Sequence, residues 1–421
     1  MNPPPHALIV GGGAAGFFAA ITCAETNPGV RVTLLERSPH LLAKVRVSGG
    51  GRCNVTHDLT DPALFTRHYP RGAKALRGPL TRFGAPETVA WFAVRGVELK
   101  TEADGRMFPV SNSSETVVNC LLDAAKAAGV AIRTRSAVRL VSADEGHFTV
   151  TLKGGGALTA DKLLLATGSN PQVYGWAEAL GHRVEPPVPS LFTFNITDAR
   201  LEGLAGISLS QVGLSLEGTG LEQRGPLLVT HWGVSGPAVL KLSAWGAREL
   251  HSKDYRAGLV INWLPDLRPE AVRERLRDFR DAGARKTVAG GNPYGLPQRL
   301  WSALVRAVGV ADKRWADLSK AELSRLLDEL SRGRFEVTGK GVFKEEFVTC
   351  GGVRLDEVNF KTMESRVLPG LYFAGEVLDI DGVTGGFNFQ SAWATGYLAG
   401  RAMAATGAAP TESGHRAQQP A

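Results

Sequence analysis

The sequence predicts an α/β protein in which a two-part, Rossmann-like nucleotide-binding domain is interrupted by inserted β-barrel-like and helical domains. Three observations predict this fold class. Residues 7–36 read as an apolar strand, a glycine-rich turn, a helix and a second strand. Short β-like runs between glycine-rich turns fill residues 191–264, and helical periodicity rich in arginine, glutamate and leucine follows over residues 265–331. The α/β pattern then returns over residues 370–405.

The elements of the first part follow from local pattern. Residues 7–10 are an apolar run of the kind that forms buried parallel strands, residues 14–26 form a helix of small residues, and residues 30–35 form the second strand. Asn112 and Glu115 have the spacing of a capping box, which predicts a helix running to about Ala128. Residues 130–152 alternate as strands do, and residues 162–166 form another apolar strand.

These elements predict five segments along the chain. The first part of the nucleotide-binding domain spans residues 1–190. Its insertions are a β-rich domain at 191–265 and a helical segment at 266–345, with a Gly-Gly-Asn-Pro break at 290–293. The second part of the nucleotide-binding domain spans 346–405. Residues 406–421 are polar and rich in Ala, Gly and Pro, which predicts a disordered tail.

Composition limits the classes of protein to consider. The 421 residues carry 48 Lys/Arg against 41 Asp/Glu, and residues 266–344 alone hold 17 Lys/Arg against 11 Asp/Glu. This surplus permits an anionic partner such as nucleic acid, although a solvated arginine-rich helical surface is the favoured interpretation, since charge alone identifies no partner. Four separated cysteines argue against a disulfide framework or zinc ribbon, and no metal site is expected. Without a signal peptide or membrane-length apolar run, the expected location is the cytoplasm.

The glycine-rich turn after the first strand fits the pattern G-x-G-x-x-G. Gly11 permits the tight turn, Gly13 lets the backbone approach a pyrophosphate, and Gly16 lets helix and strand pack closely. Glu36 ends the second strand twenty residues after Gly16, where an acidic side chain accepts hydrogen bonds from ribose hydroxyls. Because strand, turn, helix and acidic residue occur together, the sequence predicts a dinucleotide site.

Three later segments favour FAD over NAD. Residues 162–168 resemble the "ATG" strand of two-part flavoproteins, which returns under the dinucleotide. Residues 371–376 resemble the last sheet strand of those proteins, with Glu376 placed to contact the ribityl or phosphate portion. Residues 382–388 lead into a helix whose N-terminus would stabilise negative charge on a reduced flavin. An NAD dehydrogenase needs none of these segments.

The segment Lys44 to Thr56 contains three consecutive glycines flanked by Ser48, Arg52 and Asn54, which can present backbone N–H groups to phosphates or to the flavin edge. Cys53 has two interpretations. Beside Arg52 its thiol could be acidified and exchange a proton near the flavin, or it could be a small buried residue in a tight loop. The second is the more common role of a single cysteine.

His231 is the second candidate proton donor. It lies in the run Thr-His-Trp-Gly-Val-Ser-Gly-Pro at residues 230–237, from which it could reach a substrate out of the inserted domain. The simpler interpretation is a turn and helix start, with Ser235 capping a helix that begins at Pro237.

Together these segments resemble the BaiN/RdsA-type flavoproteins, a family also called aminoacetone-oxidase-like. The resemblance covers nearly the whole chain through SGGGRCNVTH, GRMFPVSNSSETVV, THWGVSGPAVL and VTCGGVRLDEVNFKTMESRVLPGLYFAGEVLDIDGVTGGFNFQSAW. It implies a Rossmann-like FAD domain with β-barrel-like and helical insertions, and NAD(P)H-linked or oxidase activity. His57 departs from the pattern, which has asparagine there, and Cys350 departs from it as well.

The candidate catalytic residues are Cys53 and His231. The candidate cofactor-binding residues, from the motifs and the resemblance, are Gly11, Gly13, Ala15, Gly16, Glu36, Arg37, Lys44, Ser48, Gly49, Gly50, Gly51, Arg52, Cys53, Asn54, Ala166, Thr167, Gly168, Gly375, Glu376, Asp379, Asp381, Gly385, Gly386, Phe387 and Asn388.

The expected cofactor is FAD, with NAD(P)H as a transient reductant because no second dinucleotide fold is evident. The resemblance implies hydride transfer from flavin N5 to an activated C=C bond of a small molecule, or dihydrouridine formation in rRNA that binds the basic insertion. An amine oxidase and a binding protein that retains flavin are further alternatives.

Overall fold

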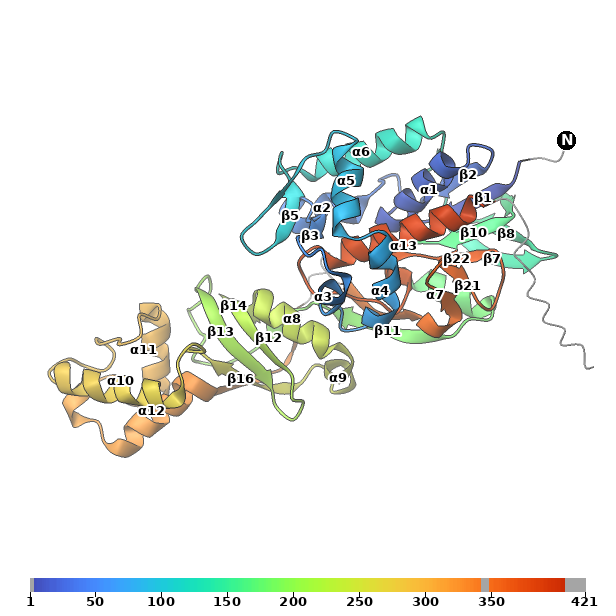
Figure 1. The fold of residues 1–421 in the computed structure, drawn as a ribbon. Coiled ribbons are helices and arrows are strands. Elements are labelled where there is room, and N and C mark those ends of the chain that lie inside the picture. The colour runs from blue at the N-terminus through green and yellow to red at the C-terminus, as the bar shows by residue number, and fades with distance from the viewer. Residues whose placement is uncertain (1–3, 342–347, 406–421) are drawn as a thin grey trace, which may run out of the picture.

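A parallel sheet positions the nucleotide-binding elements in the computed structural model, which describes residues 4–341 and 348–405 (Figure 1). Its strand order is β20-β21-β22-β10-β1-β2-β6, and the five strands from β22 to β6 are parallel. The bounds are β1 His6–Val10, β2 Arg31–Leu35, β6 Ala131–Arg133, β10 Lys162–Leu165, β20 Val358–Asn359, β21 Glu364–Ser365 and β22 Leu371–Phe373. β1 is buried along its whole length, as its apolar sequence predicts.

Two helices from opposite ends of the chain pack together beside this sheet. They are α1 (Ala14–Thr26) and α13 (Phe387–Met403). Gly396 and Gly400 make the close approach possible, because a Cβ atom at either position would lie 2.5 Å from the carbonyl oxygen of Ala15 or Ala19. The two halves of the nucleotide-binding domain are thereby joined into one core.

Smaller elements complete this domain. The antiparallel sheet of β7 to β9 matches the strand pattern expected after residue 130. Their bounds, and those of the remaining elements, are α2 Ala43–Gly51, β3 Thr56–His57, α3 Pro62–Thr66, α4 Ala73–Arg82, α5 Ala85–Ala93, β4 Leu99–Thr101, β5 Arg106–Pro109, α6 Ser114–Ala127, β7 Val138–Asp144, β8 His147–Leu152, β9 Ala157–Ala160, α7 Pro171–Ala179, η2 Leu355–Glu357 and η3 Gly375–Val377. The capping box expected from Asn112 and Glu115 is wrong: Ser113 is the N-cap of α6, and Glu115 instead pairs with Arg46 at 2.6 Å.

The insertion leaves and re-enters this domain through two paired strands, β11 (Val184–Ser190) and β19 (Val348–Val353). Its seven-stranded sheet has the order β17-β16-β13-β14-β15-β12-β18. The bounds are β12 Phe194–Asn195, β13 Ser208–Leu216, β14 Glu222–Thr230, β15 Gly233–Ser235, β16 Ala257–Asn262, β17 Gly333–Val337 and β18 Gly339–Lys340. The two edge strands of this sheet, β17 and β18, are separated in sequence only by Thr338. The sheet therefore curls back on itself in the expected barrel-like manner.

The helices of the insertion are α8 Pro237–Trp245, α9 Ala247–Ser252, α10 Pro269–Ala282, α11 Gln298–Ala307, η1 Trp315–Asp317 and α12 Lys320–Arg332. In Figure 1, α10 to α12 lie at the far end of the molecule, beyond the inserted sheet. Sheet and helices share one apolar core that includes Trp263, Trp301 and Trp315. The predicted division at residue 265 thus separates segments with a common core, because β17 and β18 return to the sheet after α12. Residues 406–421, expected to be disordered, lie outside the described residues.

One ion pair and one mostly buried arginine fasten the insertion to the nucleotide-binding domain. Asp381 is fully buried and pairs with Arg71, whose Nη1 also donates to the Ala244 carbonyl of α8 at 2.7 Å. Asp379 pairs with Arg248 of α9 at 2.8 Å. Both aspartates follow η3, so the loop after this short helix contacts the insertion directly.

Candidate functional site

A cavity of about 960 Å³ runs from the first glycine-rich turn to the start of α13. Its volume is at the upper end for small-molecule sites, about 300–1,000 Å³. The carboxyl ends of parallel strands border it, the usual ligand position in such sheets. Eighteen predicted cofactor residues line it: Gly11, Gly13, Ala15, Glu36, Arg37, Lys44, Ser48, Gly49, Gly50, Asn54, Ala166, Thr167, Gly168, Gly375, Glu376, Gly385, Gly386 and Asn388.

The turn before α1 has the geometry of a phosphate cradle. Gly11 has φ +121°, and a Cβ atom there would lie 2.3 Å from the Ala166 carbonyl oxygen. A Cβ on Gly16 would lie 1.9 Å from the Gly11 oxygen, so Gly16 serves helix–strand packing rather than the cavity wall. Gly13, by contrast, has no atom within 4 Å of its Cβ position, and no side chain caps α1. The first-turn N–H groups of α1 therefore face open space suited to an anion.

Glu36 is oriented by the backbone around it. Its Oε2 accepts from Gly12 N at 2.9 Å, and its Oε1 accepts from Ser38 N at 2.8 Å. A carboxylate oxygen has a second lone pair, so both oxygens retain capacity for a ribose hydroxyl. The side chain is half-buried at the cavity wall, in the position that the dinucleotide motif predicts.

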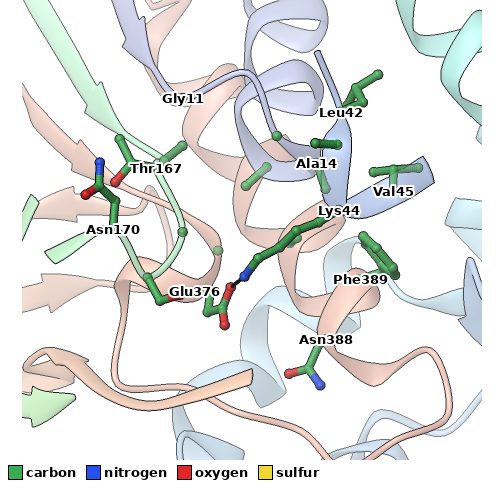
Figure 2. A pocket seen from close by; sticks show the side chains of 18 of the residues that line it. Gly11, Ala14, Leu42, Lys44, Val45, Thr167, Asn170, Glu376, Asn388 and Phe389 are labelled. Atoms are coloured by element: carbon green, nitrogen blue, oxygen red, sulfur yellow. Dashed lines mark hydrogen bonds and ion pairs between the residues drawn. The ribbon is translucent and has the colours of Figure 1, made fainter. Parts of the chain in front are cut away.

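An ion pair connects opposite walls near the middle of the cavity. Figure 2 shows Lys44 of α2 reaching Glu376 of η3, with Nζ and Oε2 2.6 Å apart. The other oxygen of Glu376 accepts from Thr349 N of β19 at 3.0 Å. Glu376 thus links the cavity to the strand through which the insertion re-enters the domain.

The three glycines after Ser48 turn the chain through left-handed conformations, with φ values of 58°, 67° and 82°. Gly49 and Gly50 face the cavity and Gly51 does not. Asn54 closes the segment: with its amide oriented to satisfy both neighbours, its oxygen accepts from Gly386 N at 2.9 Å and its nitrogen donates to Thr56 O at 3.0 Å. The loop and the start of α13 are therefore held together.

Of the two interpretations of Cys53, the acidified thiol is wrong. Cys53 is fully buried with φ +60°, and burial raises the pKa of its thiol to about 12. Arg52 turns away from it, pairing with Glu102 at 2.6 Å and covering the Phe108 ring at 4.0 Å. Neither Arg52 nor Cys53 lines the cavity. The structure thus favours the packing interpretation of Cys53.

Four more predicted residues lie outside the cavity wall. Asp379 pairs with Arg248 of the insertion, and Asp381 pairs with Arg71, as described above. Phe387 is buried and stacks on His68, with ring centroids 4.2 Å apart. His231 is exposed on the turn between β14 and β15. Ser235 lies in β15 and Gly236 is the N-cap of α8, so the predicted Ser235 cap is wrong, whereas Pro237 does begin the helix.

Sequence patterns missed part of the wall. Ser136, Ala137, Val138 and Lys153 contribute from the region of β7 and β8, and residues 169–172 with Trp176 contribute from the start of α7. Leu191 and Leu240 of the insertion reach the end near α13. Of these residues, only those at the start of α7 had a signal in the sequence, because Asn170 before Pro171 is typical of a helix start. The side chain of Asn170 caps α7 by accepting from Gln172 N at 3.3 Å. The other contacts depend on tertiary packing and leave no local pattern.

The residues present fit an FAD molecule. Thr167 lines the cavity, and its buried Oγ1 has no hydrogen-bond partner within residues 4–341 and 348–405. Positions 13 and 50 leave open space where a side chain would begin. The turn before α1 suits the pyrophosphate, Glu36 the ribose, and the start of α13 the ring end. Within the described part of the chain, no group of three His, Cys, Asp or Glu residues could hold a metal ion.

No helix within the described ranges is long and apolar enough to cross a membrane.

Comparison with known proteins identifies the family. Residues 5–402 match the HI0933-like protein Rossmann domain. The ribosomal RNA dihydrouridine synthase of Escherichia coli (strain K12) is 32% identical over 403 residues, covering 93% of this chain and 96% of that protein. The 3-dehydro-bile acid delta(4,6)-reductase of Clostridium scindens is 31% identical over 416 residues, covering 94% and 98%.

A solved structure agrees with the fold. The 3-ketosteroid-delta4-(5alpha)-dehydrogenase from Rhodococcus jostii RHA1 superposes with a TM-score of 0.50 at 16% identity, covering 96% of this chain and 98% of that one. At this identity the likeness concerns the fold alone. The chain belongs to the HI0933-like Rossmann-domain family, which confirms the family resemblance, the fold class and the assignment as an FAD-dependent oxidoreductase.

Proposed function

We propose that this chain transfers a hydride from reduced FAD to an activated C=C bond of its substrate, with NAD(P)H as the reductant. The observation that carries the proposal is the continuity of the cavity. One space joins the phosphate cradle at Gly13 to the ring end at Gly385, where Leu191 and Leu240 of the insertion supply apolar walls. Such an arrangement holds the dinucleotide along the sheet and leaves its ring end facing the insertion.

The relatives support the reaction class. One is named for reducing delta(4,6) positions of a 3-dehydro-bile acid, and another for converting uridine in rRNA to dihydrouridine. Both names describe saturation of a C=C bond. Bound FAD would supply hydride at its N5 atom. The chain's own contribution is to bind the dinucleotide, to hold the substrate against the ring end and to exclude water there.

A second candidate is dihydrouridine synthesis in rRNA. The supporting observation is a set of exposed cationic side chains on the far helices, including Arg273 and Arg277 of α10 and Arg306 of α11, none of which pairs with a carboxylate within the described ranges. Lys and Arg side chains of this kind neutralise phosphates and give salt-dependent RNA binding. An RNA substrate would also have to present its uridine out of the stack.

The test uses purified, FAD-reconstituted protein under anaerobic conditions. Addition of NADH or NADPH is expected to bleach the visible flavin absorbance, and a subsequent enone is expected to restore it. Restoration by uridine-containing rRNA fragments, but by no enone, would favour the RNA candidate. Bleaching by an amine with peroxide release in air would favour an amine oxidase. RNA binding without bleaching by any reductant would favour a binding protein, and failure to take up FAD would overturn the assignment.

A further inference from the structure

Lys44 extends across the cavity from one side of the phosphate cradle. It lies in the first turn of α2, whose N-cap residue Leu42 donates its N–H to the Gly12 carbonyl at 2.9 Å. The start of α2 is therefore tied to the turn that leads into α1. The Lys44 side chain is 61% exposed and its Nζ lies 2.6 Å from Glu376 Oε2, so the ion pair crosses on the solvent side of the cavity (Figure 2).

Glu376 is the fixed partner on the other side of the cradle. Gly375 before it packs on α1, because a Cβ there would lie 2.9 Å from the Cβ of Ala15. Both oxygens of the Glu376 carboxylate are engaged, Oε1 by Thr349 N of β19 at 3.0 Å and Oε2 by Lys44. The lysine side chain is a long, flexible stem that ends in a compact charge. Opening of the pair is therefore a movement of Lys44.

A dinucleotide that fills the cavity has to lie under this ion pair. Its adenosine belongs near Glu36, its flavin ring near Gly385, and its pyrophosphate at the first turn of α1 between them. One ring system therefore lies on each side of the pair, and neither can pass between partners that are 2.6 Å apart. FAD can be laid into the cavity, or lifted out of it, only while the pair is open.

The charges at the cradle favour closure over a bound dinucleotide. The N-terminus of α1 supplies a partial positive charge of about half an elementary charge, whereas a pyrophosphate is a dianion. A lysine ammonium has more N–H donors than Glu376 engages. Lys44 can therefore donate to a phosphate oxygen while it keeps its carboxylate partner.

We propose that Lys44 and Glu376 form a strap that closes over the pyrophosphate of bound FAD, and that opening of this strap controls how fast the cofactor enters and leaves. The inference goes beyond the proposed function, since it holds for whatever substrate the reduced flavin meets. Glu376 acts here as a positioning residue that holds Lys44 over the cradle. Because Thr349 N holds the carboxylate, the strand by which the insertion re-enters the domain also keeps the strap in place.

The experiment measures both rates of FAD exchange, without reductant or substrate. Mixing FAD-free protein with FAD gives the association rate constant from the change in flavin fluorescence, and dilution of the loaded protein gives the dissociation rate constant. Lys44→Met is expected to raise both rate constants about two- to fivefold, the effect of removing one exposed ion pair. The faster association is diagnostic, because loss of a positive charge by itself slows the approach of an anionic ligand.

Lys153→Met is the matched control, because Lys153 is an exposed cation that lines the cavity near its adenosine end. It removes the same charge without touching the strap, and the association rate constant should fall or stay unchanged. Glu376→Gln retains an oxygen that can accept from Thr349 N, and it should also raise both rate constants. If Lys44 were only a phosphate ligand, releasing it from the carboxylate would slow FAD dissociation instead.

Slower association in Lys44→Met, slower dissociation in Glu376→Gln, or unchanged rate constants in both variants would each overturn the strap. Faster exchange in both variants of a protein that no enone reoxidises would support the strap and refute the proposed function alone.

Discussion

Gly13→Ala separates cofactor binding from folding more cleanly than any other substitution in the phosphate cradle. Gly13 is the N-cap of α1 with φ −95° and ψ −169°, a conformation that alanine adopts without strain. Its Cβ would meet no atom within 4 Å and would project into the cavity. In the FAD-free protein, the free energy of unfolding should change by less than about 1 kcal/mol, because alanine restricts the unfolded chain but is a poorer N-cap residue than glycine.

FAD binding, by contrast, should weaken. The added methyl group occupies the space in which a phosphate oxygen approaches the N–H groups of α1, and such overpacking costs about 1–3 kcal/mol. The dissociation constant for FAD is therefore expected to rise by about 5- to 150-fold. Flavin fluorescence titration measures this constant, and urea unfolding of the FAD-free protein measures stability.

Gly78→Ala is the matched control, since its Cβ also meets nothing within 4 Å but lies in α4, away from the cavity. It should leave the FAD dissociation constant unchanged. Gly16→Ala should instead disrupt folding, because its Cβ would lie 1.9 Å from a backbone oxygen. An unchanged affinity for FAD in Gly13→Ala, at unchanged stability, would refute the placement of the pyrophosphate at this turn.

Three further predictions concern stability. Asp381→Asn leaves the mostly buried Arg71 without its counter-ion, and urea unfolding should show a loss of about 3–5 kcal/mol; a loss below 1 would contradict the role given to this pair. Lys162→Met removes the ammonium that donates to the carbonyls of Ala402, Met403 and Ala405 at the end of α13, so the loss should be about 1–2 kcal/mol; no change would show that water replaces it. Because burial lowers the pKa of His68 to about 4, the unfolded chain binds the extra proton between about pH 6.5 and 4. Stability contributed by neutral His68 is thus present above pH 6.5 and falls as the pH drops through this range, and His68→Gln should flatten that part of the profile of unfolding free energy against pH.

Local chemistry made the cofactor end of the site predictable. The turn at residues 11–16 requires glycines for steric reasons that the structure bears out at Gly11 and Gly16. Glu36 ends its strand at the predicted distance along the chain, and β10, β22 and α13 begin within a residue or so of their expected positions. The barrel-like sheet was also visible as alternating runs between glycine turns. These features share one cause, since each depends on backbone conformation over fewer than about ten residues.

Side-chain roles were predicted less well where they depend on distant partners. Arg52 was considered as a charge that could lower the pKa of its neighbour Cys53. It instead forms an ion pair with Glu102 and covers the ring of Phe108, both of which lie some fifty residues further along the chain. Asp379 and Asp381 are acidic residues of the kind that bind cofactors, but each forms an ion pair within the protein. Asp379 pairs with Arg248 of α9, and Asp381 pairs with Arg71, which precedes α4. A carboxylate pairs with whichever cation the fold brings near it, and the spacing of residues in the sequence does not predict which cation that is.

The sequence by itself determined the two-part nucleotide-binding domain, the insertion and the phosphate cradle, because short-range sterics and hydrophobic periodicity specify them. Only the tertiary structure decided that the inserted strands and helices share one core, that Cys53 is buried with a raised pKa, and that the rings of His57, His68 and Phe387 stack together. The physical reason is the range of the interaction. Burial, ion pairing and the grouping of side chains from three distant segments arise from packing between residues that are far apart along the chain.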